Sequence, residues 1–127
     1  MNDKGSNKLT ALRVLIVEDE MLLAMDLEGL LEAQGCIVEA VNSIPLALSA
    51  IQDWAPDVVT LDLNLDGESS EPIAAFLRKR NIPFVVVTGY SDSLAEFTNI
   101  KKAPLVKKPY NCEELIEKVR GVVKDRP

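Results

Sequence analysis

The sequence predicts an α/β fold, a five-stranded parallel β-sheet with helices on both faces. Two observations predict it. Short apolar, β-branched runs alternate with segments of helical pattern along most of the chain, as expected of strand–helix–strand units. The runs 58–61 and 84–87 lack the apolar–polar alternation of a half-exposed strand, so we expect strands buried on both faces. The length of 127 residues suits one domain of this kind.

Local signals place the individual elements. Gly35 is expected to end the first helix, and Asn42-Ser43 to cap the second. Right-handed crossovers make 2-1-3-4-5, the flavodoxin-like order, the natural arrangement of five strands. In chain order, we expect strand 12–17, helix 20–34, strand 36–41, helix 44–53, strand 57–63, helix 70–80, strand 84–87, helix 91–100, strand 104–106 and helix 111–124.

Composition limits both the organisation and the function. Residues 1–11 are mostly polar and are expected to form a flexible tail before a single domain over 12–124. The absence of histidine excludes Ser-His-Asp and Cys-His catalysis, histidine-ligated zinc and donation of a phosphoryl group from histidine. The net charge of -6 argues against a nucleic-acid partner. No stretch has the apolar length of a membrane span, and we expect a cytoplasmic protein.

The predicted strands deliver polar side chains to one edge of the sheet. Glu18 and Asp19 follow the first strand, Asp62 ends the third, Thr88 follows the fourth, and Lys108 follows the fifth. Because the carboxyl ends of parallel strands share an edge, and ligands bind there, we expect these groups to converge.

Three neighbouring carboxylates repel one another, by about 4 kcal/mol for a pair at ~4 Å and an effective dielectric of ~20. They must therefore take up protons or bind a cation. Oxygen ligands without histidine or cysteine favour Mg²⁺, which keeps open positions that suit a phosphate. The carboxylate of Asp62 could attack phosphorus and form an aspartyl-phosphate. Thr88 could donate a hydrogen bond to a phosphoryl oxygen, and Lys108 could neutralise its charge.

Four short motifs stand at the ends of predicted strands. They are Val14-Leu15-Ile16-Val17-Glu18-Asp19-Glu20, Leu61-Asp62-Leu63-Asn64-Leu65 with Gly67, Val87-Thr88-Gly89-Tyr90, and Val106-Lys107-Lys108-Pro109-Tyr110. In this order they resemble the receiver domain of bacterial two-component response regulators, over residues 12–124.

The resemblance implies that Asp62 accepts a phosphoryl group from the phosphohistidine of a sensor histidine kinase or a histidine phosphotransfer protein. It implies that Thr88 and Lys108 reposition around the phosphoryl group, and that a cis peptide bond before Pro109 directs Lys108 into the site. The ligands that it implies for Mg²⁺ are Glu18, Asp19, Asp62 and the backbone carbonyl of Asn64.

The sequence departs from the family pattern at several positions. Glu18 stands where aspartate is commoner. Leu105 occupies the position at which many receivers carry a switch tyrosine or phenylalanine, which puts that coupling in doubt. Tyr90, two residues after Thr88, is more often a packing residue than a chemical one, although it could gate the site. The Thr-Gly-Tyr and Lys-Pro-aromatic motifs resemble a subgroup of single-domain receivers.

The first helix offers a candidate docking surface. Its expected core stripe is Leu23, Leu27, Leu30 and Leu31. Met21, Leu22 and Met25 lie off this stripe, where they are either covered by neighbouring loops or form a face for a helical partner such as the phosphodonor. For Glu20, at the start of the helix, we favour a charge in the first helical turn over a third acid near the metal.

We therefore expect a single-domain response regulator with no output domain. It would act by protein contact or onward phosphotransfer to an unknown downstream protein, and would not be an enzyme. One alternative is a receiver-like interaction module that is never phosphorylated. A second is a phosphohydrolase with an aspartate nucleophile, disfavoured because Asn64 stands where such enzymes place a second aspartate.

Overall fold

The computed structural model describes residues 9–89 and 103–124. The expected helix 91–100, Tyr90 and residues 1–8 lie outside the described residues. The helices and strands are β1 (Arg13–Val17), α1 (Met21–Ala33), β2 (Ile37–Val41), α2 (Ile44–Asp53), β3 (Val58–Asp62), β4 (Asn64–Leu65), β5 (Glu68–Ser69), α3 (Glu71–Lys79), β6 (Phe84–Thr88), β7 (Leu105–Lys107) and α4 (Cys112–Lys124).

Five strands form one parallel sheet in the order β2-β1-β3-β6-β7. Counted without the two short strands, this is the predicted order 2-1-3-4-5, and the predicted α/β fold is confirmed. The short strands β4 and β5, which were not predicted, form an antiparallel hairpin after β3. Its turn contains Asp66 and Gly67 at φ values of 52° and 88°. An Asp-Gly pair with positive φ at both residues is the turn chemistry that a two-residue hairpin requires.

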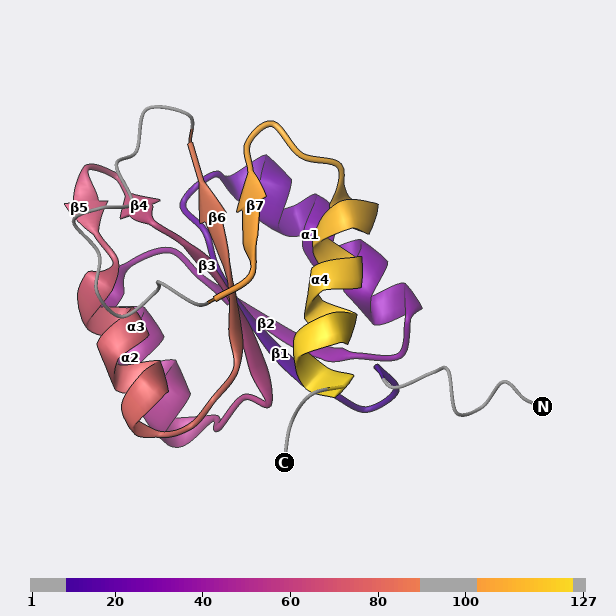
Figure 1. Cartoon of the computed structure of the whole chain (residues 1–127), viewed down its shortest axis with the longest axis horizontal. Helices are drawn as coiled ribbons and strands as arrows, with labels where there is room; N and C mark the ends of the chain where they lie inside the picture. The colour runs from indigo at the N-terminus through magenta and orange to yellow at the C-terminus, as the bar shows by residue number, and fades with distance from the viewer. Residues whose placement is uncertain (1–8, 90–102, 125–127) are drawn as a thin grey trace.

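The helices cover the sheet from both sides. Helices α1 and α4 lie on one face, and α2 and α3 lie on the other (Figure 1). Successive residues of β1 point to opposite faces, so Val14 and Ile16 join the core under α1 and α4 while Leu15 and Val17 join the core under α2 and α3. Strands β3 and β6 are buried along their whole length, which explains their continuous apolar sequence.

Helix α1 buries a narrower stripe than the sequence suggested. Ala24, Leu27 and Leu31 are buried, but Leu30, expected in the core, is 41% exposed. The helix packs mainly against β2 and β1 and against α4, and Leu30 at the border of the stripe stays partly in solvent. Three residues expected in the flexible tail are part of the folded domain, which therefore begins earlier than predicted. Among them, Leu9 is fully buried.

A cluster at the amino end of the sheet fixes β1 to β3. The Arg13 guanidinium donates a hydrogen bond to the Trp54 carbonyl and lies 4.4 Å from the centroid of the Trp54 ring. The backbone N–H of Arg13 donates to Asp57 Oδ2 at 2.9 Å, and the Asp57 N–H donates to the Arg13 carbonyl at 2.8 Å. The charged groups of this cluster therefore have close partners.

No helix among the described residues combines the length and apolarity needed to cross a membrane.

Candidate functional site

Four strands end at the same edge of the sheet and carry the predicted polar residues there. The strand register pairs Val17 with Leu61, Asp62 with Val87, and Thr88 with Lys107. The residues that follow these pairs therefore emerge side by side. The structure brings together Glu18 and Asp19 after β1, Asp62 at the end of β3, Thr88 at the end of β6, and Lys108 after β7.

The three carboxylates form one acidic cluster. Glu18, Asp19 and Asp62 each offer an oxygen, and these oxygens all lie within 4.8 Å of one another. As whole residues, Glu18 and Asp62 are only 5% and 4% exposed, whereas Asp19 is more open to solvent. Three oxygen donors without nitrogen or sulfur fit a hard divalent cation such as Mg²⁺.

Lys108 is the cation of the site. Its Nζ lies 3.2 Å from Glu18 Oε2 and 3.0 Å from Asp62 Oδ2, and it also donates to Glu20 Oε2. Its backbone N–H donates to the Thr88 carbonyl at 2.8 Å, and the peptide bond to Pro109 is cis. The ammonium of Lys108 thus lies within the acidic cluster, where it balances part of the negative charge.

Burial governs the protonation of the cluster. It raises the pKa of Glu18 to about 7, and the neighbouring Asp62 carboxylate adds to this while the Glu20 N–H and Lys108 oppose it. Burial likewise raises the pKa of Asp62, although hydrogen bonds from Lys108 and Asn64 lower it in part. Burial disfavours the charged form of Lys108, but its hydrogen bonds to Glu20 and Asp62 outweigh this and raise its pKa. The cluster therefore carries a carboxylate that prefers a proton or a cation near neutral pH.

Backbone amides orient the carboxylates. The Asn64 N–H donates to Asp62 Oδ1 at 3.1 Å, and the Glu20 N–H donates to Glu18 Oε2 at 3.0 Å. The Asp66 N–H in the hairpin turn donates to Asp19 Oδ2 at 2.7 Å. The β4–β5 hairpin thus ties the strand that carries Asp62 to the carboxylate that follows β1.

Thr88 ends β6, and Leu105 begins the neighbouring strand β7. Thr88 is 3% exposed, and its hydroxyl donates to the Gly89 carbonyl at 3.0 Å. Leu105 packs against the core under α2 and α3, so the position of the common switch aromatic residue is aliphatic and partly buried. The predicted gating residue, Tyr90, lies outside the described residues.

Sequence reasoning missed the contact that Glu20 makes. We favoured a charge in the first turn of α1, but Glu20 is the N-cap residue and its side chain makes no capping hydrogen bond. Its carboxylate instead pairs with Lys108. The run of three acidic residues was the available signal, but only the tertiary structure shows where the third one points.

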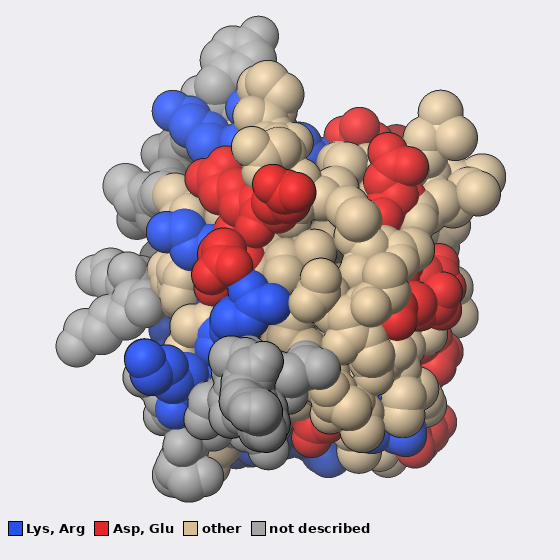
Figure 2. Space-filling model, turned by 90° about the vertical axis from the view of Figure 1, so that its right-hand side faces the viewer, with Lys and Arg blue, Asp and Glu red and all other residues tan. Residues whose placement is uncertain are grey.

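An apolar surface borders the acidic cluster. Met21, Leu22 and Met25 are 72%, 78% and 57% exposed, so no described loop covers them. Between this face of α1 and the start of α2 lies a cleft of about 290 Å³, whose lining includes Glu18, Asp19 and Leu46. The exposed Leu46 was not predicted as part of this surface. Figure 2 shows the side covered by α1 and α4, where acidic side chains border a broad uncharged surface.

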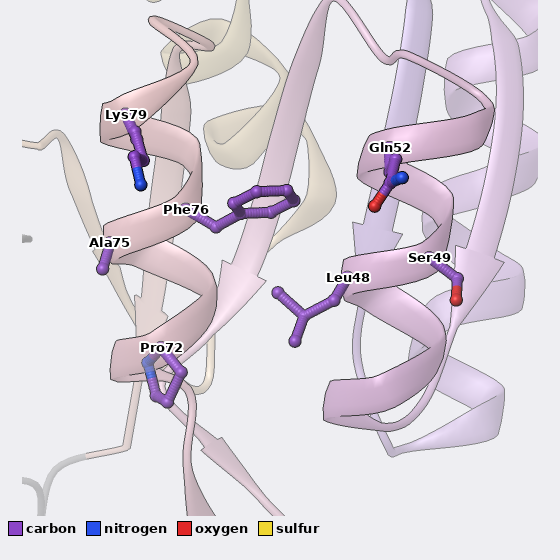
Figure 3. Close-up of a pocket in the computed structure, with 7 residues that line it drawn as sticks. All are labelled: Leu48, Ser49, Gln52, Pro72, Ala75, Phe76 and Lys79. Carbon is purple, nitrogen blue, oxygen red and sulfur yellow. The ribbon is translucent and has the colours of Figure 1, made fainter.

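A separate groove of about 520 Å³ lies between α2 and α3. Leu48 and Phe76 point toward one another across it, and Lys79 is the charged residue among the described residues that line it (Figure 3). None of the described residues that line this groove belongs to the acidic cluster, so the groove and the cluster are separate sites.

Residues 14–120 match the family of response regulator receiver domains. The chain belongs to this family. The receiver is 35% identical over 114 residues to the sensory transduction protein RegX3 of Mycolicibacterium smegmatis, which corresponds to 87% of this chain and 50% of RegX3. The receiver thus spans about half the length of the curated relatives it matches.

Solved structures agree with the family. The solution structure of SdrG from Sphingomonas melonis Fr1 is 36% identical with a TM-score of 0.76, and the match covers 90% of the receiver and 98% of that chain. A response regulator receiver protein from Sinorhizobium medicae WSM419 has a TM-score of 0.82 at 26% identity, covering 94% of the receiver and all of that chain. The chain is therefore the receiver domain of a two-component response regulator, and its acidic cluster is compatible with Mg²⁺ and phosphorylation.

Proposed function

We propose that this receiver accepts a phosphoryl group on Asp62 from the phosphohistidine of a sensor histidine kinase or a histidine phosphotransfer protein. The observation that carries the proposal is a buried Asp62 carboxylate beside two further carboxylates and the Lys108 ammonium. Glu18, Asp19, Asp62 and the backbone carbonyl of Asn64 would hold Mg²⁺. The ion supplies positive charge beside the transferring phosphoryl group.

In the transfer, an Asp62 carboxylate oxygen forms a bond to phosphorus while the bond from phosphorus to the donor's imidazole nitrogen breaks. The imidazole nitrogen keeps the electron pair. Lys108, already 3.0 Å from Asp62 Oδ2, neutralises charge on the phosphoryl oxygens. The Thr88 hydroxyl, which donates to the Gly89 carbonyl, would exchange that acceptor for a phosphoryl oxygen. The new contacts of Thr88 and Lys108 with the phosphoryl group would convert phosphorylation into a rearrangement of β6 and β7.

The apolar face of α1 (Met21, Leu22 and Met25) would dock the donor. It borders the cleft that reaches Asp19, so a helix packed on it would carry a phosphohistidine toward the acidic cluster. Exposed methionines suit a surface that adapts to a partner helix.

In this proposal the receiver acts as a single-domain response regulator in the cytoplasm. The signal would pass by protein contact or onward phosphotransfer, and the net charge of -6 disfavours nucleic acid as the partner. The receiver would not be an enzyme, because the group that reacts is its own Asp62.

The test is the intact mass after incubation with Mg²⁺ and acetyl phosphate. We expect wild type to gain one phosphoryl unit that hydroxylamine removes. Asp62→Asn should gain none, because the nucleophilic oxygen is lost. Asp53→Asn, which changes an exposed aspartate at the end of α2, is the matched control and should gain the unit. No gain by wild type, even with candidate kinases supplied, would favour the unphosphorylated interaction module.

A further inference from the structure

Glu20 makes an ion pair that the proposed transfer does not use. It is the N-cap residue of α1, yet its side chain makes no capping bond, and its backbone N–H donates to Glu18 Oε2. The Glu20 carboxylate turns away from the helix and accepts a hydrogen bond from Lys108 Nζ. Its side chain is 60% exposed, whereas those of Glu18 and Asp62 are 4% and 5% exposed.

Lys108 therefore has no hydrogen-bond donor to spare. A lysine ammonium carries three N–H donors, and the structure gives this one three carboxylate partners, Glu18, Glu20 and Asp62. A phosphoryl oxygen can bind Lys108 only if one of these partners is released.

Exposure decides which partner is released. Losing Lys108 would leave Glu18 or Asp62 as a buried carboxylate with one cationic partner fewer, which is costly. Glu20 returns to water at little cost because exposed ion pairs contribute little net free energy. We propose that Glu20 is a positioning residue: its carboxylate accepts the third N–H of Lys108 until a phosphoryl oxygen takes the place of that carboxylate. This inference rests on the proposed phosphorylation of Asp62.

This exchange predicts a kinetic effect. With glutamine at position 20, the side chain keeps an acceptor but loses the charge that competes with the phosphoryl group for Lys108. We expect Glu20→Gln to take up phosphoryl from acetyl phosphate about two- to five-fold faster at saturating Mg²⁺, the range expected for an exposed pair. Glu32→Gln, which removes an exposed acid further along α1, is the matched control for net charge and should leave the rate unchanged.

A double-mutant cycle separates this role from a general charge effect. In a Lys108→Met background, we expect Glu20→Gln and Glu32→Gln to have the same rate, because the group that Glu20 positions is gone. An acceleration that persists without Lys108, or one that Glu32→Gln shares, would overturn the inference.

A second readout does not depend on phosphorylation. The ammonium protons of Lys108, followed by NMR in protein labelled with ¹⁵N-lysine, should exchange with water faster in Glu20→Gln than in wild type or Glu32→Gln. An unchanged Lys108 signal in Glu20→Gln would overturn the inference even if Lys108→Met took up no phosphoryl group. Faster exchange of Lys108 together with no phosphorylation of wild type would instead sink the proposed function and leave the Glu20 contact standing.

Discussion

The two ends of the sheet treat charge in opposite ways. At the amino end, the Arg13 guanidinium lies on Trp54 and Arg13 exchanges two hydrogen bonds with Asp57. At the carboxyl end, one ammonium serves several carboxylates, and burial raises the pKa of Glu18 to about 7. The contacts at the amino end join β1 to the segment before β3 and stabilise the fold. The carboxyl end holds more negative than positive charge, and binding of a cation or a proton would lower the repulsion. The contacts that stabilise the fold and the groups proposed to react therefore lie at opposite ends of the same strands.

The largest effect on stability should come from the amino end. We expect Arg13→Ala to lower the free energy of unfolding by about 3 kcal/mol, because it removes a charge-assisted hydrogen bond and a cation–π contact. Urea unfolding followed by circular dichroism measures this. The loss should be the same with and without Mg²⁺. Lys118→Ala, which removes an exposed cation of α4, is the control and should change little. Equal losses in the two variants would remove the special role of the amino end.

Mg²⁺ should act only at the carboxyl end. At a concentration 100 times its dissociation constant, it should raise the free energy of unfolding by about 2.7 kcal/mol. The gain should be the same in wild type and Arg13→Ala, and most of it should be lost in Asp19→Asn, which removes a ligand. Unfolding in Mg²⁺ and in EDTA gives both values. A gain that Asp19→Asn retains in full would place the ion elsewhere.

The pH dependence should come from Glu18. Its folded pKa of about 7 lies above its ordinary value of 4.5, so the folded state holds the proton more tightly than the unfolded state. Without metal, the contribution of Glu18 to stability should therefore be lost as pH rises through the window between 4.5 and 7, by up to about 3 kcal/mol. Unfolding in EDTA at pH 5, 6, 7 and 8 measures the fall.

Glu18→Gln should flatten this profile, while Glu32→Gln should keep it. A profile that keeps its slope in Glu18→Gln would assign the titration to another group. Added Mg²⁺ should reduce this fall, because a bound cation takes the place of the proton that Glu18 loses.

The smallest effect on stability should come from the apolar face of α1. Met25 is 57% exposed, so Met25→Glu should change the free energy of unfolding by less than about 0.5 kcal/mol. The same change should slow phosphotransfer from the cognate kinase but not from acetyl phosphate. Leu30→Glu, at another exposed apolar position of α1, is the matched control and should slow neither. Equal slowing with both donors would show that Met25 acts on the chemistry and not on docking.

The sequence predicted the sheet because its strands are buried. Continuous apolar runs such as β3 and β6 can be recognised as strands from the sequence alone. The end of each run then predicts which side chain lies at the carboxyl edge of the sheet. That is why the cluster of Glu18, Asp62 and Lys108 could be anticipated from residues far apart in the chain.

What the sequence could not predict depends on side-chain direction beyond the strand ends. The sequence places Glu20 at the start of a helix, but in the structure its carboxylate forms an ion pair with Lys108. Leu30 fits an apolar helical stripe, but it is 41% exposed. The contact between Arg13 and Trp54 joins residues 41 positions apart and follows no local pattern.

Trp54 gives the molecule a built-in optical probe. It is the one tryptophan of the chain, and it lies against Arg13 at the end of the sheet away from the acidic cluster. Its fluorescence should therefore change when the domain unfolds but stay nearly constant when Mg²⁺ or a phosphoryl group binds. Folding can thus be followed by fluorescence without interference from the chemistry of the site.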